Sequence, residues 1–514
     1  MPYGITNDEA GYIYNAYSIS QTGRDVNGRF LPLSINLDNP FSPVPIYLNA
    51  IFLRILGLSV FTGRFFYALL GTGSILLIYL IAKILFKDYR VGLISSFVLA
   101  ISPWHLHVSR SAYEAGVALF FFLLAFLIFL IKTEKGNINW SLPFFLLAFY
   151  SYHGTKIFFI PFIVILALNY KEILIRRKRE FILFIVGIGF IILSFLYLGK
   201  KQNAFGRSQI FLIYDVQNAA KLVDLERQKN TAPFIVRQIF NNKLLYFLRV
   251  IRENYLNAFS PGYLFLYGET SGMGSVYGTF FRGEMYVLDL PFLIFGIFIL
   301  EGKYKKLRNT IFLSLLAAPL TTTFTSDVAY VMRAIMMLPF LCLLVGLGVF
   351  SFIKAIEKYS LVVRKAILII LFGWYLFLLA SYLYQYHFRY SVYGAESWFR
   401  SSRELSDFIM QKKNEYNKIY IASAGSMFIL QYGVFAKVEP EKISHAWTDQ
   451  SFKELENISF LKECIDNKKS PLEFLPDHTL YIVPDGCHKS ASPSSVIKDF
   501  GEPLRTIWKI YSKE

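Results

Sequence analysis

Charged residues, cysteines and nucleotide-binding loops are all scarce in this sequence. Only 17% of the 514 residues are charged, whereas 54% are hydrophobic and 18% are aromatic. Soluble domains carry about 25% charged residues, so this composition favours a membrane protein. No CxxC pair or His/Cys cluster indicates a zinc site, and no glycine-rich loop indicates a bound nucleotide.

Three cysteines are present. Cys342 lies in an apolar run, where a thiol is most often inert packing. Cys464 and Cys487 lie in a polar C-terminal tail, and the sequence leaves open whether they are bonded to each other.

The basic residues show a pattern typical of membrane orientation. The formal net charge is +17, but the lysines and arginines fall mostly in short loops between apolar runs. No basic stripe with interleaved aromatics is found elsewhere in the sequence, so we expect no nucleic-acid partner.

Ten segments approach the length of about 20 mostly apolar residues that a membrane helix requires. The fold class expected is therefore a polytopic α-helical membrane protein with about ten spans. The expected spans are 60–86, 90–108, 115–132, 139–152, 155–170, 180–199, 286–301, 308–326, 329–353 and 364–384.

The loops between these spans predict the topology. Every second loop is rich in Lys and Arg, and these loops are therefore expected on the cytoplasmic side of the cell membrane. The segments 1–59, 200–285 and 385–514 then lie outside, and 60–199 and 286–384 form two membrane bundles.

The outer segments show their own patterns. Residues 44–57 are apolar but short and predict an interfacial helix, and residues 237–259 predict an amphipathic helix on the membrane surface. The tail alternates a helical stretch at 396–413 with strand-like runs. These runs, at 418–423, 479–484 and 504–511, predict a small extracytoplasmic α/β domain.

An acidic pair, Asp8 and Glu9, begins a helical stretch near the start of the chain. The spacing Thr6-x-x-Glu9 fits a capping box, and acids also suit the dipole at a helix N-terminus. The alternative is catalytic, because a carboxylate held near an acceptor hydroxyl takes its proton as a new bond forms.

Several short motifs, in order along the chain, resemble a known family. The first outer segment carries Asp8-Glu9-Ala10, Tyr14-Asn15-Ala16-Tyr17, Thr22-Gly23-Arg24-Asp25 and Gly28-Arg29-Phe30-Leu31-Pro32. Gly63-Arg64-Phe65, Ser102-Pro103-Trp104-His105, Tyr152-His153, Phe259-Ser260-Pro261 and Met337-Leu338-Pro339 follow. Over about residues 5–350 this order resembles the dolichyl-phosphate-mannose protein mannosyltransferase superfamily, in particular its bacterial branch with the lipid A aminoarabinose transferases.

The resemblance implies a GT-C fold glycosyltransferase that uses a polyprenyl-phosphate sugar and acts outside the membrane. It implies that Asp8 is the general base, with inversion at the anomeric carbon, and that Glu9 supports the site. Its first span, which normally precedes this loop, is expected upstream of Met1. Some members are thought to use a divalent metal, and the sequence leaves this open. The acceptor implied is a protein, a lipid or a glycan.

Three arginines at the outer ends of expected spans are candidates for binding the donor phosphate. The expected topology can bring Arg64, Arg110 and Arg333 together near the interface, where fixed cations are needed for the charge that develops on the leaving lipid phosphate. The alternative for each is a side chain that extends to the phosphates of ordinary membrane lipids. Glu114 follows Arg110 by four residues, the spacing of a helical ion pair.

The remaining candidates are less specific. Tyr152, His153, Asp25 and Glu114 are candidates for a donor or acceptor pocket. A histidine at the interface is more often a hydrogen-bonding group, and Asp25 within Gly-Arg-Asp is typical of a turn.

Two other functions compete with the glycosyltransferase. An O-antigen polymerase or ligase also has many spans and a large outer loop, but it is not expected to depend on an early acidic pair. A transporter of lipid-linked sugars needs polar groups near the centre of the bilayer, and the spans here are almost free of charge at their centres.

Overall fold

The computed structural model describes residues 3–37, 40–202, 211–212, 215–270, 274–326, 329–448, 453–465, 470–488, 491–499 and 505–513. The chain divides into two compact units. The first unit comprises Met1–Leu37, Pro43–Phe66 and Leu383–Glu514, and the second comprises Asp38–Ser42 and Tyr67–Tyr382. The expected outer segment 1–59, apart from Asp38–Ser42, and the tail from 385 therefore fall in one unit.

In the first unit, the N-terminal helix packs against helices of the C-terminal domain. Helix α1 (Asn7–Thr22) contacts α2 (Pro43–Leu56), α23 (Met427–Phe435) and α24 (Pro440–Thr448). The other elements of this unit outside its large sheet are β1 (Ile35–Asn36), the start of α3 (Val60–Phe86), η6 (Gln385–Arg389), α21 (Tyr390–Tyr393), η7 (Glu396–Trp398), α22 (Arg400–Lys412) and α25 (Pro471–Phe474).

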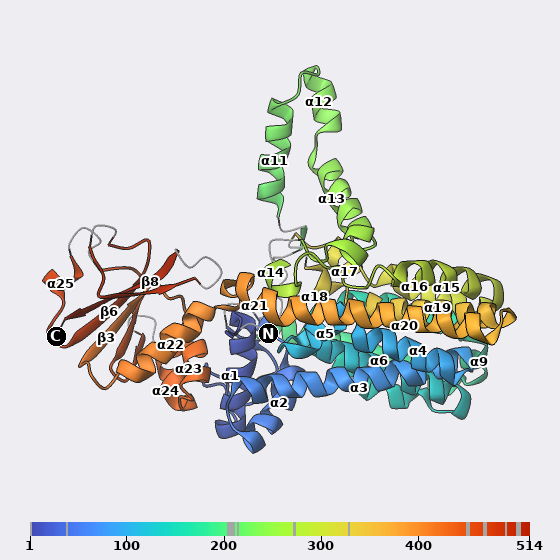
Figure 1. Cartoon of the computed structure of the whole chain (residues 1–514), viewed down its shortest axis with the longest axis horizontal. Helices are drawn as coiled ribbons and strands as arrows, with labels where there is room; N and C mark the ends of the chain where they lie inside the picture. Colours follow the sequence, from blue (N-terminus) through green and yellow to red (C-terminus); the bar gives the residue numbers. More distant parts are fainter. Residues whose placement is uncertain are drawn as a thin grey trace. The chain divides into compact units, whose positions relative to one another are not determined.

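The expected α/β domain is confirmed as a six-stranded mixed sheet, shown with β3, β6 and β8 labelled in Figure 1. Its strand order is β4-β5-β3-β6-β8-β7, and the central β3 runs parallel to both β5 and β6. The strands are β3 (Lys418–Ala422), β4 (Lys453–Leu455), β5 (Ile458–Leu461), β6 (Thr479–Pro484), β7 (Ser495–Lys498) and β8 (Thr506–Lys513).

The two faces of this sheet are covered differently. Phe428 of α23 contacts Phe460 and Trp508 on one face. A core that includes Tyr481, Tyr511 and Leu475 covers the other face. A disulfide joins Cys464 to Cys487 beside this second core, which resolves the pairing that the sequence left open.

The second unit is almost entirely helical. Its elements are β2 (Pro40–Phe41), the rest of α3, α4 (Tyr89–Ile101), α5 (Pro103–Arg110), α6 (Glu114–Lys135), η1 (Ile138–Ser141), α7 (Leu142–Ser151), α8 (Thr155–Asn169), α9 (Lys171–Arg176), α10 (Lys178–Gln202), α11 (Val216–Gln228), α12 (Phe234–Phe240), α13 (Lys243–Asn257), η4 (Gly262–Leu266), α14 (Gly274–Tyr277), α15 (Asp289–Lys303), α16 (Lys305–Ala317), α17 (Leu320–Thr323), α18 (Tyr330–Arg333), α19 (Met337–Ala355), η5 (Ile356–Lys358) and α20 (Leu361–Tyr384).

Fewer helices than expected have the length of a span. In the described part of the chain, five are long and apolar enough to cross a membrane, namely α3, α6, α10, α19 and α20. Helices α4 and α5 add a sixth if they form one span bent by 61°. The expected count of ten is not confirmed, because several apolar runs form shorter or broken helices.

The broken helices have clear sequence causes. The expected span 308–326 ends as α16 at Ala317, because Pro319 cannot continue the hydrogen-bond ladder, and α17 follows as a single turn. The expected span 329–353 begins with the short α18, and its long helix, α19, starts only at Met337. Hydropathy counts the apolar residues in such runs but does not detect these breaks.

Close packing of α15 on α19 shows why two glycines matter in this bundle. A Cβ atom on Gly296 would lie 2.0 Å from the Leu344 carbonyl oxygen, and one on Gly348 would lie 1.9 Å from that of Phe292. Small residues allow the two backbones to approach, as they do between membrane helices in general.

The expected amphipathic helix 237–259 is interrupted. Helix α12 ends at Phe240, and α13 begins after Asn242, whose side chain accepts a hydrogen bond from the Leu245 N–H. Together with α11 these helices form a hairpin that projects from the bundle, seen at the top of Figure 1.

Candidate active site

The acidic pair lies at the start of α1, where the expected capping box is confirmed. The Thr6 hydroxyl accepts a hydrogen bond from the Glu9 N–H (3.2 Å), and the Glu9 carboxylate accepts one from the Thr6 N–H (3.3 Å). Glu9 therefore satisfies one of the free amide groups that every helix start leaves.

Glu9 also forms a buried ion pair with Arg64 in the first turns of α3. The Arg64 guanidinium donates from Nε to Oε1 at 2.8 Å and from Nη2 to Oε2 at 2.7 Å. The Glu9 side chain is fully buried, and that of Arg64 is 14% exposed. Such two-point pairing is the strongest form of carboxylate recognition.

Further contacts hold the Arg64 side chain in this position. Its Nη2 atom also donates to the Gly4 carbonyl oxygen at 3.0 Å, and its guanidinium lies over the Trp398 ring. Gly4 is required here, because a Cβ atom on it would lie 1.9 Å from the Trp398 carbonyl oxygen. Arg64, predicted to bind phosphate, is thus engaged with Glu9, Gly4 and Trp398.

Asp8 differs from Glu9 in its burial and in its partners. Its side chain is half-buried, and no described residue forms a hydrogen bond or ion pair with its carboxylate. Its neighbour Asn7 is fixed by Gln431 of α23, which donates to the Asn7 side-chain oxygen at 3.0 Å. The helix start is therefore held in place while the Asp8 carboxylate stays available.

Asp25 is used by the local turn. Its carboxylate accepts hydrogen bonds from the backbone N–H groups of Asn27 and Arg29 and pairs with the Arg29 guanidinium at 2.6 Å. The side chain is only 1% exposed. These contacts are those of a turn former, the alternative that the sequence favoured.

In the second unit, Arg110 and Glu114 lie on either side of a break between helices. Arg110 is the last residue of α5 and is half-buried, and Glu114 is the first residue of α6 and is buried. Arg333 ends α18, where its Nη1 atom donates to the Thr325 hydroxyl at 3.1 Å.

Tyr152 and His153 form the junction between α7 and α8. Tyr152 is buried, and its carbonyl oxygen accepts a hydrogen bond from the Thr155 hydroxyl at 2.7 Å. The Thr321 hydroxyl donates to the Gly154 carbonyl oxygen at 2.6 Å, so the junction is bonded to α17. His153 is half-buried beside it.

Sequence reasoning missed a buried pair of acids, Glu269 and Glu284. They are 1% and 4% exposed, and the Glu269 N–H donates to the Glu284 carboxylate at 3.3 Å. The Glu269 carboxylate accepts a hydrogen bond from the Val331 N–H at 3.2 Å, and Val331 lies two residues before Arg333. Burial, and then the nearby Glu269, raise the pKa of Glu284 well above its ordinary value.

No set of three or more His, Cys, Asp and Glu side chains that could hold a metal ion occurs among the residues that the structure describes.

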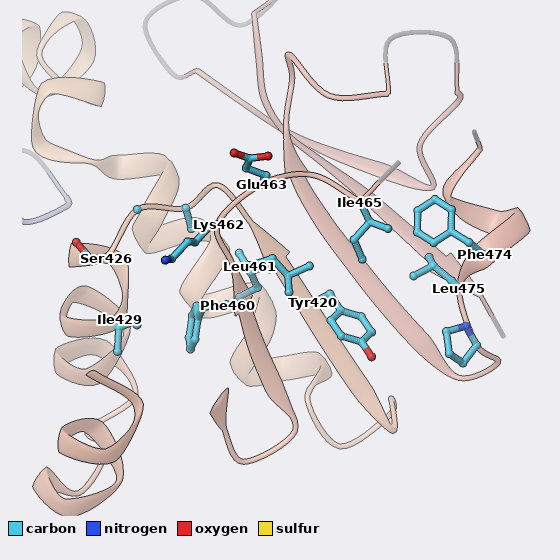
Figure 2. Close-up of a pocket in the computed structure, with 14 residues that line it drawn as sticks. Tyr420, Ser426, Ile429, Phe460, Leu461, Lys462, Glu463, Ile465, Phe474 and Leu475 are labelled. Atoms are coloured by element: carbon cyan, nitrogen blue, oxygen red, sulfur yellow. The ribbon is translucent and has the colours of Figure 1, made fainter. Parts of the chain in front are cut away.

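A separate cavity of about 890 Å³ lies in the sheet domain (Figure 2). Its lining includes residues that follow β3 and β5, such as Ser426 and Lys462, at the carboxyl ends of these parallel strands. Ile429 of α23 lines it, whereas Gln431, two residues on, bonds to the start of α1. The cavity and the start of α1 therefore lie against different faces of α23.

Comparison with known proteins agrees with the resemblance seen in the sequence. Residues 38–197 match the family described as dolichyl-phosphate-mannose-protein mannosyltransferase. ArnT from Cupriavidus metallidurans in the apo state is similar in structure, with a TM-score of 0.52 at 10% sequence identity, over 99% of this chain and 94% of that chain. This chain therefore has a GT-C fold.

A second structure of ArnT, bound to undecaprenyl phosphate, gives a TM-score of 0.55 at 11% identity over the same shares of the two chains. No curated protein matches the chain in sequence. The likeness to ArnT at this identity establishes the fold, and the roles of individual residues rest on the geometry described above.

The Glu9–Arg64 pair predicts a distinctive double-variant result. Arg64→Met leaves a buried carboxylate without its partner and should destabilise the protein by about 3 kcal/mol. Adding Glu9→Gln should restore most of that loss, because glutamine keeps the capping box without a buried charge. Thermal unfolding of the purified chain in detergent measures both effects. Equal stabilities for the single and the double variant would show that the pair is not structural.

The buried acid Glu284 predicts a pH dependence of stability. Its pKa is raised in the folded state above the ordinary value of 4.5. The stabilising contribution of Glu284 to the free energy of unfolding is therefore complete below pH 4.5. It is lost as the pH rises through the higher pKa that Glu284 has in the folded protein. Glu284→Gln should flatten this decline when apparent melting temperatures are measured from pH 4.5 upward. The exposed Glu441→Gln serves as control and should follow the wild-type curve. Parallel curves for Glu284→Gln and wild type would contradict the assignment.

Proposed function

We propose that this protein is a membrane glycosyltransferase that transfers a sugar from a polyprenyl-phosphate donor to an acceptor hydroxyl or amine. The proposed reaction takes place on the extracytoplasmic face and inverts the anomeric carbon, with Asp8 as general base. The observation that carries the proposal is the contrast within the acidic pair: Glu9 is buried and fully engaged, whereas Asp8 is unengaged and held on an anchored helix start.

The chemistry requires only a base and a stabilised leaving group. The acceptor oxygen or nitrogen attacks the anomeric carbon while its proton passes to the Asp8 carboxylate. The bond from the anomeric carbon to the phosphate oxygen breaks, and its electron pair leaves with the polyprenyl phosphate. The donor class is supported by the family match and by the ArnT fold, since one ArnT structure is bound to undecaprenyl phosphate.

We assign the developing phosphate charge to Arg110 and Arg333. Both are half-buried at helix ends, where a guanidinium is partly desolvated and its charge acts more strongly. Arg64 and Glu9 receive a positioning role, because their charges already neutralise each other. Tyr152, His153 and Glu114 are kept as candidates for the donor or acceptor pocket, and Asp25 as a turn former.

The catalytic proposal predicts the effect of Asp8→Asn. Asparagine cannot accept the proton, so transfer should fall by roughly 10²–10⁴-fold while membrane insertion stays normal. Release of polyprenyl phosphate from a panel of polyprenyl-phosphate sugars measures the rate. The exposed Glu441→Gln in α24 of the same unit is the matched control and should transfer normally. Unchanged transfer by Asp8→Asn would remove Asp8 from the mechanism and favour a polymerase-type enzyme.

The proposed orientation predicts the accessibility of single cysteines. Cys342 is buried and Cys464 is bonded to Cys487, so an introduced cysteine provides the one reactive thiol in the described part of the chain. Leu33→Cys, 51% exposed in the native protein, should react with an impermeant maleimide in intact cells. Lys178→Cys should react only after the membrane is opened. Labelling in the reverse order would place Asp8 on the wrong side.

A further inference from the structure

The projecting hairpin of α11, α12 and α13 exposes apolar side chains and uses polar groups to hold itself together. Helix α12 has no buried residue, and Ile235, Phe240 and Leu244 are 71%, 68% and 67% exposed. These values match those of α20, where Ile369 is 70% exposed and only Tyr375 and Tyr382 are buried. Side chains of this kind need an apolar surrounding.

Polar contacts between the helices fix the shape of the hairpin. The Arg227 guanidinium donates to the Asn241 carbonyl oxygen at 2.8 Å, and that of Arg237 donates to the Arg227 carbonyl oxygen at 3.1 Å. Arg249 pairs with Glu226 at 2.6 Å and ties α13 to α11. The exposed apolar side chains are therefore not needed to join the helices of the hairpin to one another, because the arginine contacts already do so.

Both arms of the hairpin are mounted on the segment 316–325. Phe211, just before α11, forms a β-bridge with Thr325, and the Leu212 N–H donates to the Phe324 carbonyl oxygen at 3.0 Å. From α13, the Asn254 side chain donates to the Thr325 carbonyl oxygen and the Tyr255 hydroxyl to that of Leu316. The hairpin is thus joined to the bundle at two points on each arm.

The direction of the hairpin suits the surface of a bilayer. Within the second unit, α19 and α20 run along the bundle, whereas α11 and α13 rise steeply away from it (Figure 1). They leave from the end of the bundle at which α5 and α18 lie. An element that runs across the direction of α19 and α20, at one end of the bundle, has the direction expected of an element in the plane of the lipid–water interface.

The hairpin also has a polar stripe and a basic excess. Gln217, Asp224 and Gln228 are exposed and share one face of α11 by helical spacing. Between Asp215 and Asn257 the sequence has seven basic residues against four acidic ones. Basic residues beside an apolar stripe are typical of helices that lie in anionic membrane surfaces.

We propose that the α11–α13 hairpin is an interfacial anchor that lies flat in the lipid–water interface, with its apolar side among acyl chains and its basic residues near lipid phosphates. The partner is a lipid surface. The proposal does not depend on the identity of the transferred sugar or on the role of Asp8.

The test uses the full chain in nanodiscs of mixed phosphatidylglycerol and phosphatidylcholine. A cysteine introduced by Ile239→Cys carries the environment-sensitive NBD fluorophore, and Gln228→Cys provides the control on the polar stripe. We expect blue-shifted emission and several-fold stronger quenching by spin-labelled lipids for the label at 239 than for the label at 228.

Two results would overturn the proposal. A label at 239 with water-like emission and no lipid quenching would show that the hairpin stands in solvent. A blue shift without lipid quenching would show that a protein surface, such as a second copy of the chain, covers it. Labels at Leu244→Cys and Phe240→Cys repeat the measurement, so that one poorly folded variant does not decide the outcome.

Discussion

The buried two-point ion pair between Glu9 and Arg64 is the contact on which the N-terminal site depends. It connects the start of α1 to the start of α3, and through the Gly4 carbonyl oxygen and the Trp398 ring it fixes the segment that precedes α1. A buried carboxylate needs such a partner, since an unpaired charge in this position is strongly destabilising. The consequence for chemistry is indirect. Glu9 both caps α1 and pairs with Arg64. The backbone at the neighbouring Asp8 is therefore fixed by contacts in which the Asp8 carboxylate takes no part.

Local sequence signals predicted the local structure well. The spacing of Thr6 and Glu9 predicted the capping box, and the alternation of apolar residues predicted β3, β6 and β8 within two residues of their ends. The partner of Glu9 could not be predicted in this way, because 55 residues separate it from Arg64 along the chain. An arginine at the outer end of a span has the same sequence pattern whether it meets a lipid phosphate or a buried carboxylate. Only the fold distinguishes the two.

In the second unit, sequence patterns failed at the local level, because they did not detect where apolar helices break. Hydropathy predicted ten spans because it averages over apolar runs and does not detect breaks such as the one at Pro319, after which only the short α17 follows. Irregular backbone inside a helical bundle needs protein groups that satisfy its free carbonyl oxygens, as the Thr321 hydroxyl does for that of Gly154. Glu269 and Glu284 were missed for a related reason. Acids in a polar loop are usually solvated, and nothing in their spacing indicates that the loop folds back and buries them beside Val331.

Thr325 contacts both arms of the hairpin and also Arg333. Thr325 forms the bridge to Phe211 and accepts the hydrogen bond from Asn254, and its hydroxyl accepts another from Arg333. Thr325 therefore helps to position both the base of the hairpin and Arg333, which is proposed to bind the donor phosphate. If the hairpin lies in the interface, its depth fixes the depth of Arg333 through contacts only a few ångströms long. Lipid phosphates lie at the depth of the interface. An anchor in the interface would therefore hold the Arg333 guanidinium at the depth of the phosphate of a lipid-linked donor.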